Sequence, residues 1–96
     1  MGKFRLKVED RAKTDFAKIY KSGDKATIKK LEKIIEELSN NPKIGTGNPE
    51  QLKHNLSGYW SRRINKKDRL IKDRLIYEII KEPENLVVVV SVLGHY

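Results

Sequence analysis

The stretch "LVVVVSVLG" (residues 86–94) decides the fold predicted for this chain. Its residues are apolar at both odd and even positions, which would point to opposite faces of a strand. One polar residue, Ser91, interrupts the run. A strand that is apolar on both faces lies inside a sheet and is covered on each side. We therefore expect residues 86–94 to form a central strand, which the turn "KEPEN" (81–85) joins to the segment before it.

Three further segments have the character of strands. "GYWSRRI" (58–64) and "DRLIYEII" (73–80) are rich in β-branched and aromatic residues, whereas "KFRLKV" (3–8) alternates charged and apolar side chains. Two helices are expected between residues 9 and 40, because apolar residues recur there at helical spacing. In the stretch that separates the helices, Gly23 is predicted to end the first helix and Asp24 to cap the second.

The predicted order is βααβββ, an α+β fold in which a two-helix hairpin packs on a mostly antiparallel four-stranded sheet. The segment "KIGTGNPEQLKHNLSG" (43–58) has no clean period and is expected to be a loop. A chain of 96 residues is long enough for one compact core, so residues 1–96 are expected to form a single domain.

The chain is strongly basic. It has 21 Lys and Arg against 13 Asp and Glu, a formal net charge of +8, and residues 53–74 hold eight basic residues against two acidic ones. Such a balance favours a polyanionic partner. The chain has no cysteine, and its charged N-terminus is typical of neither a secretory signal nor a membrane span, so we expect a cytoplasmic protein that does not bind a membrane.

A carboxylate and a histidine flank the basic region. Glu50 precedes the strand at 58–64, and His95 follows the last strand. This set can cleave RNA through its own 2′-hydroxyl: the carboxylate takes the hydroxyl proton, arginines stabilise the phosphorane, and the histidine protonates the leaving oxygen. Tyr59 and Trp60 could stack on bases or simply pack in the core. No metal or other cofactor is expected, since His54 and His95 lack a ligand set.

The segment "NPEQLKHNLSGYWSRRI" (48–64), together with the terminal "HY" (95–96), closely resembles the YoeB toxins of the RelE and ParE superfamily. These toxins are the toxic halves of bacterial type II toxin-antitoxin pairs. The resemblance implies a RelE-like fold and a ribosome-dependent endoribonuclease. Its substrate would be messenger RNA in the A site of the 70S ribosome, and a YefM-like antitoxin would hold it inactive. The family also suggests a homodimer.

The resemblance assigns roles to particular residues. Glu50 is expected as general base, His95 as general acid, and Arg63 as a phosphate contact in the catalytic set. A further arginine is expected at the start of the strand at 73–80. The remaining residues expected to contact RNA are Lys53, His54, Arg62, Arg69 and Tyr96.

The word "KDRLI" occurs twice in succession, at 67–71 and 72–76, so either Arg69 or Arg74 could be that further arginine. If the first copy joined the strand, Arg74 would take the place of Ile79, and burying an unpaired arginine costs several kcal/mol. If the second copy joins it, Leu70 and Ile71 move into a longer hairpin, which forfeits about 3–5 kcal/mol of burial. We therefore predict Arg74 as the catalytic arginine, with Arg69 on the hairpin.

Other interpretations of the sequence differ in function. The duplication could give a catalytically impaired or register-switching toxin, including one that exchanges its hairpin between protomers. The chain could instead be a non-enzymatic ParE-like gyrase inhibitor or a plain RNA-binding module. Mutation of Glu50 and His95 discriminates among these, because neither a gyrase inhibitor nor an RNA-binding module needs an acid and a base.

Overall fold

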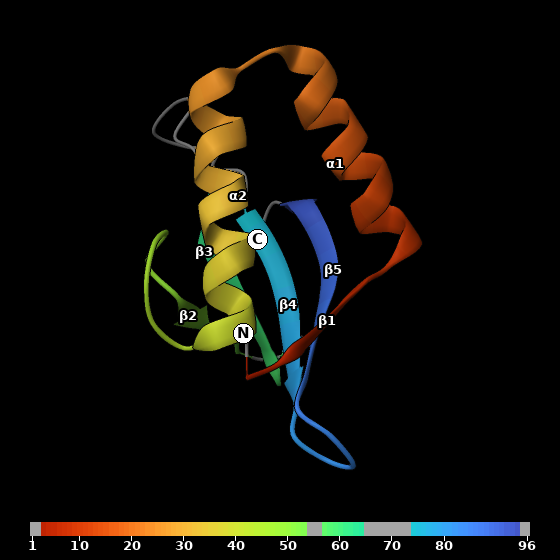
Figure 1. The fold of residues 1–96 in the computed structure, drawn as a ribbon, viewed down its shortest axis with the longest axis vertical. Helices are drawn as coiled ribbons and strands as arrows, with labels where there is room; N and C mark the ends of the chain where they lie inside the picture. Colours follow the sequence, from red (N-terminus) through yellow and green to blue (C-terminus); the bar gives the residue numbers. More distant parts are fainter. Residues whose placement is uncertain (1–2, 54–56, 65–73, 95–96) are drawn as a thin grey trace.

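Two helices and a five-stranded sheet make up the part of the chain that the computed structural model describes, residues 3–53, 57–64 and 74–94 (Figure 1). The elements are β1 (Arg5–Val8), α1 (Asp10–Ser22), α2 (Lys25–Asn40), β2 (Glu50–Gln51), β3 (Tyr59–Arg63), β4 (Arg74–Ile80) and β5 (Leu86–Gly94). The strand order is β1-β5-β4-β3-β2, with β1 parallel to β5 and the other neighbours antiparallel.

The predicted α+β architecture and the two-helix hairpin are confirmed. The sheet, however, has five strands among the described residues and not four, because β2 forms inside the segment that was expected to be a loop. The strand at 86–94 is an interior strand, as predicted, since β5 lies between β1 and β4. The expected cover on each side is wrong for the helices, because both lie on one face of the sheet.

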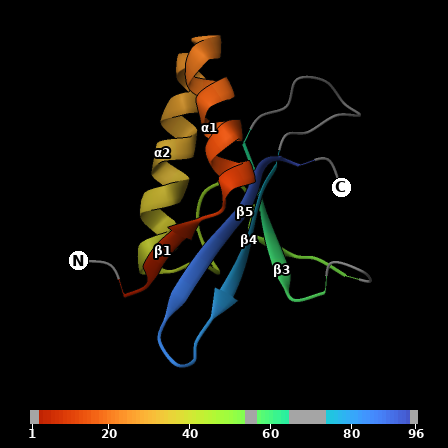
Figure 2. The same cartoon turned by 90° about the vertical axis from the view of Figure 1, so that its right-hand side faces the viewer.

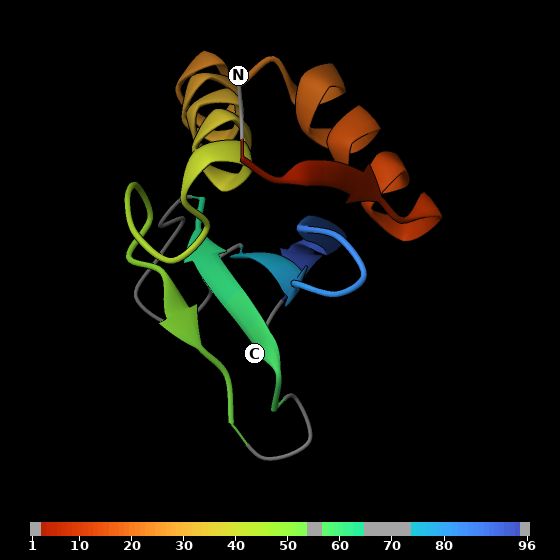
Figure 3. The ribbon, with the colours of Figure 1, turned by 60° about the horizontal axis from the view of Figure 1, so that its bottom comes forward.

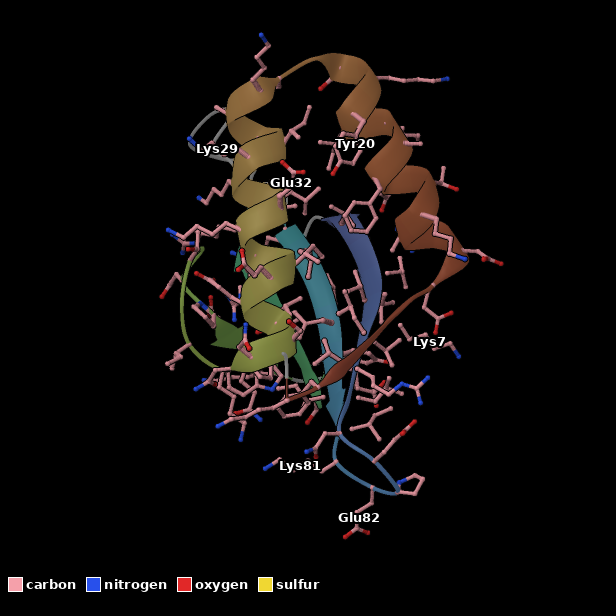
Figure 4. All side chains as sticks on the ribbon, in the orientation of Figure 1. Lys7, Tyr20, Lys29, Glu32, Lys81 and Glu82 are labelled. Atoms are coloured by element: carbon pink, nitrogen blue, oxygen red, sulfur yellow. The ribbon has the colours of Figure 1, made fainter. Side chains whose placement is uncertain are left out.

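Local signals set the limits of the helices. α1 ends where Gly23 adopts a left-handed conformation with φ 71° and donates its amide to Tyr20. Asp24 caps α2, because its carboxylate accepts the Thr27 amide at 3.2 Å and the Thr27 hydroxyl at 2.7 Å. Both predictions are confirmed. Tyr20 of α1 is 49% exposed and lies between the two helices (Figure 4).

Both helices cover the same face of the sheet, and the core lies between the two layers (Figure 2). Its fully buried apolar side chains include Leu31, Ile34, Leu38, Leu75, Tyr77, Val87, Val89 and Val92. Burying one such side chain stabilises the fold by about 1.5–3 kcal/mol. Trp60 packs against the margin of this core, so it serves packing. The helices therefore occupy one face, and we call the opposite one the outer face.

The pairing of β3 with β4 answers which copy of "KDRLI" enters the sheet. Residues 59–63 pair with 74–78, and Arg63 is directly opposite Arg74. The second copy therefore supplies the strand, as predicted. The first copy, with Arg69, lies outside the described residues.

The end of β5 is irregular and is held by α1. The register with β4 shifts between Arg74 and Tyr77, so β5 uses more residues than β4 over this stretch. Asp15 of α1 is buried there and accepts the Val92 amide at 3.0 Å and the Ser91 hydroxyl at 3.3 Å. The one polar residue of the apolar strand thus has a buried partner.

Candidate active site

The outer face of the sheet collects two of the predicted catalytic arginines. Side chains alternate between faces along a strand. Arg62 reaches α2, where its guanidinium binds Glu37, so Arg63 belongs to the outer face. Arg74 is the direct partner of Arg63 in an antiparallel ladder, in which paired residues share a face. The two arginines therefore lie beside each other, and both are half-buried.

Glu50 joins these arginines from β2. It pairs with Ser61, two residues before Arg63 on β3. Diagonal neighbours on one face are about 7–8 Å apart, within reach of long side chains. Figure 3 shows β2 beside β3 at the edge of the sheet. The exposed carboxylate and the two guanidiniums thus share one region of the outer face, while their catalytic roles stay predictions.

Backbone contacts along β3 fix the position of Glu50. The Arg63 amide donates to the carbonyl of Gly47 at 2.7 Å, and the Leu52 amide donates to the carbonyl of Tyr59 at 2.9 Å. Gly47 has φ 86°, and a Cβ there would lie 2.6 Å from the carbonyl oxygen of Arg63. A glycine is therefore required where this segment approaches β3.

Arg63 keeps one donor available. Its Nε atom is buried and has no hydrogen-bond partner in the part of the chain that the structure describes. An unsatisfied buried donor costs about 1–3 kcal/mol. Such an atom on the outer face, next to a second arginine, suits an anionic ligand better than it suits the protein alone.

The position of Arg62 contradicts the prediction that this residue contacts RNA. Its side chain is completely buried, and its Nη1 lies 2.6 Å from Glu37 Oε1. Its other nitrogen atoms bond to backbone carbonyls and to the Tyr77 hydroxyl. The expected contact of Arg62 with RNA does not fit this placement, because no part of the guanidinium reaches the surface.

The buried cluster around Arg62 shifts two pKa values. Burial acts to raise the pKa of Glu37, but the hydrogen bonds from Thr46 and Arg62 and the charge of Arg62 outweigh it, so the pKa is lowered. Burial raises the pKa of Tyr77, and Arg62 offsets only part of this effect. Glu37 is therefore held as a carboxylate and Tyr77 as a neutral phenol.

The other predicted site residues are only partly placed. Lys53 is exposed, shortly after β2. His54, Arg69, His95 and Tyr96 lie outside the described residues, so their roles stay predictions. Gly94, which directly precedes His95 in the sequence, is paired with Arg74.

Residues 3–53, 57–64 and 74–94 contain no group of three or more His, Cys, Asp or Glu that could hold a metal ion. Within the same residues, no helix has both the length and the apolar character to cross a membrane.

Three residues that hold the segment leading to Glu50 belong to no motif and were not predicted: Glu37, Thr46 and Gly47. One signal was available for Arg62. Core packing was one of the two roles considered for Trp60, and Arg62, two positions later on the same strand, must share its face. Glu37 carries no comparable signal, since exposed glutamates occur throughout α2.

The sequence is similar to a family model and to several known proteins. The family model for the YoeB-like toxin of bacterial type II toxin-antitoxin systems matches residues 9–96. Toxin YoeB of Escherichia coli O6:H1 is 52% identical over 48 residues, 50% of this chain and 57% of that toxin, so the match spans little more than half of that relative. Toxin YoeB of Streptomyces coelicolor is 36% identical over 73 residues, 76% of this chain and 77% of that toxin.

Solved structures agree over nearly the whole chain. A YoeB/ParE toxin from Agrobacterium tumefaciens has a TM-score of 0.78 at 26% identity, covering 97% of this chain and 100% of that one. A YoeB dimer from Staphylococcus aureus has a TM-score of 0.75 at 32% identity, covering 98% and 99%. The toxin in a heterotetrameric YoeB-YefM complex from the same species has a TM-score of 0.72 at 32% identity, covering 97% and 98%. The chain belongs to the YoeB-like toxin family of bacterial type II toxin-antitoxin systems.

Proposed function

We propose that this chain is a metal-independent endoribonuclease that stops translation in the cytoplasm by cutting messenger RNA in the A site of the ribosome. The observation that carries the proposal is the pairing of Arg63 with Arg74 on the outer face, with Glu50 at the diagonal position. Phosphodiester cleavage needs a base and concentrated positive charge in one place, and in this proposal Glu50 is the base and the two arginines supply the charge. Membership of a toxin family supports the same conclusion.

In the proposed reaction, Glu50 removes the proton from a ribose 2′-hydroxyl, and the 2′-oxygen attacks the neighbouring phosphorus. The bond from phosphorus to the 5′-oxygen of the next nucleotide breaks, and His95 donates a proton to that oxygen. The products are a 2′,3′-cyclic phosphate and a 5′-hydroxyl. Arg63 and Arg74 stabilise the charge on the phosphorane oxygens, and losing one such donor typically costs about 10²–10³ in kcat.

The unpartnered donor of Arg63 supports this role. A phosphate oxygen near Arg63 Nε would supply the acceptor that the described residues lack. A charge-assisted hydrogen bond of this kind is roughly twice as strong as a neutral one. The binding of the scissile phosphate would therefore relieve a cost that the free protein bears.

The remaining predicted site residues serve RNA binding in this proposal. Lys53, which is exposed, would contact the phosphate backbone, and His54, Arg69 and Tyr96 would contact RNA around the site. The net charge of +8 would attract the chain to ribosomal RNA. Association with the ribosome should then weaken steeply as salt is added.

The proposed regulator is a YefM-like antitoxin. A structural relative from Staphylococcus aureus is seen in a YoeB-YefM complex, and another is seen as a dimer. We extend both assemblies to this chain: a complex with an antitoxin that keeps the nuclease inactive, and a homodimer when the antitoxin is absent.

The test is cleavage of a defined message on purified ribosomes, mapped by primer extension. Glu50→Gln should lower the cleavage rate by about 10²–10⁴, the usual contribution of a general base. Glu84→Gln is the matched control, because Glu84 is another exposed carboxylate. It lies in the turn after β4 and is paired with Arg5 of β1. If Glu50→Gln cut as fast as the parent chain, or if the parent arrested translation without cutting, the proposal would be wrong.

A further inference from the structure

Arg62 is the most highly connected buried side chain among the described residues, and the reaction proposed above does not use it. Its Nη1 donates to Glu37 Oε1 at 2.6 Å and to the Thr46 carbonyl at 3.3 Å. Its Nη2 donates to the carbonyls of Asn41 (3.3 Å), Pro42 (3.1 Å) and Ile44 (2.9 Å). Its Nε lies 3.4 Å from the Tyr77 hydroxyl, which itself donates to the Pro42 carbonyl.

These contacts have one target in common, the segment that joins α2 to β2. Arg62 binds the carbonyls of four of its residues: Asn41, Pro42, Ile44 and Thr46. Glu37, which is paired with Arg62, accepts both the amide and the hydroxyl of Thr46 at 2.8 Å. One guanidinium and one carboxylate therefore fix the path of residues 41–46.

The fixed segment leads directly into the site. Thr46 is followed by Gly47, whose carbonyl accepts the Arg63 amide, and three residues later comes Glu50. β2 is only two residues long, so its own pairing with β3 holds Glu50 weakly. Besides its backbone contacts with β3, the carboxylate therefore depends for its position on the segment that precedes it, residues 41–46, which Arg62 and Glu37 hold.

Alternation on β3 couples the two faces. Arg62 lies between Ser61, the partner of Glu50, and Arg63, the partner of Arg74. A shift of Arg62 on the helix side would thus move the backbone that carries both halves of the site on the outer side. We infer that Arg62, together with Glu37, is a positioning residue that sets Glu50 against Arg63 for catalysis, an inference that rests on the proposed function.

The first test does not depend on activity. In Arg62→Lys and in the milder Glu37→Gln, hydrogen exchange of the Thr46 and Arg63 amides should accelerate at least about 10-fold, because local opening is governed by local contacts. The Val92 amide, bound to Asp15 in another part of the fold, should change far less. Arg5→Lys is the matched control, since Arg5 forms an exposed pair with Glu84. Equal acceleration at all these amides would mean a general loss of stability and would overturn the inference.

The second test asks whether Arg62 acts through Glu50. In single-turnover cleavage on saturating ribosomes, Arg62→Lys should lower the rate about 100-fold, the factor that a misplacement of about 1 Å can cost, with little change in KM. Glu50→Gln combined with Arg62→Lys should be no slower than Glu50→Gln alone, because the positioned group is already lost. If the two losses multiplied, Arg62 would not act through Glu50.

The two tests separate this inference from the proposed function. A parent chain that does not cut RNA would refute the proposed function, while the exchange of Thr46 and Arg63 would still decide whether Arg62 fixes the segment. A parent that cuts RNA and loses nothing in Arg62→Lys would keep the function and overturn the inference.

Discussion

Gly47→Ala tests the contact that places β2 against β3. A Cβ at Gly47 would lie 2.6 Å from the Arg63 carbonyl oxygen and 3.1 Å from its amide nitrogen, and backbone cannot rotate away as a flexible side chain can. The φ of 86° adds the strain of a left-handed conformation, about 1–2 kcal/mol for a residue with a Cβ. Separating the two backbones also weakens the bond from the Arg63 amide to the Gly47 carbonyl, worth about 0.5–1.5 kcal/mol.

The expected loss for Gly47→Ala is about 1.5–3.5 kcal/mol in the free energy of unfolding. This corresponds to a fall in Tm of roughly 6–28 °C for a chain of this size. The measurement is urea denaturation followed by circular dichroism, with Tm from a thermal scan. Cleavage should fall with it, because Arg63 and Glu50 are moved apart.

Two other glycines provide matched controls. Gly23 and Gly58 have φ 71° and 96°, on either side of the Gly47 value, and a Cβ at either would meet nothing within 4 Å. Gly23→Ala and Gly58→Ala should therefore show the conformational strain alone. If Gly47→Ala lost no more stability than these two variants, the close approach of residue 47 to β3 would be refuted.

Three further predictions concern the carboxylates of Asp15 and Glu37 and the net charge. Asp15→Ala should cost about 1–3 kcal/mol in urea denaturation, because the Val92 amide loses its acceptor, and Asp15→Asn, which keeps an oxygen, should cost less; equal losses would argue against this bond. Because the pKa of Glu37 is lowered on folding from its ordinary 4.5, stability should be full above that pH and fall below it, and Glu37→Gln should flatten this fall in a pH series of denaturation curves. Ribosome binding should lose affinity linearly in log–log plots against salt, and a flat response would contradict electrostatic docking.

Much of the fold follows from patterns in the sequence. The apolar run at 86–94 predicted an interior strand, and apolar residues at helical spacing between residues 9 and 40 predicted the two helices, of which α2 buries Leu31, Ile34 and Leu38. These predictions succeed because the spacing of apolar residues along the sequence indicates whether a helix or a strand would place them on a buried face. Asp24 and Gly23 succeed for a local reason, since each satisfies a helix end.

The predictions that failed depend on tertiary contacts. β2 has only two residues, and backbone hydrogen bonds on either side of it, including the one to Gly47, hold it against β3. No periodic pattern of side chains therefore predicts it. Arg62 and Arg63 are adjacent in the sequence and were assigned to one surface, yet a strand sends neighbouring side chains to opposite faces. One guanidinium is therefore buried with Glu37, and the other lies on the outer face.

The repeated sequence "KDRLI" allows the most direct test of the central claim, that Arg74 beside Arg63 takes part in RNA cleavage. The repeat supplies its own control. Arg69 and Arg74 have identical neighbours in sequence, but only Arg74 is seen opposite Arg63 among the described residues. The measurement is primer-extension mapping of a defined message on purified ribosomes with the parent chain, Arg69→Ala and Arg74→Ala. The account predicts that Arg74→Ala lowers cleavage by about 10²–10³ and that Arg69→Ala changes it only a few-fold. Loss of cleavage in Arg69→Ala with cleavage kept in Arg74→Ala would contradict it.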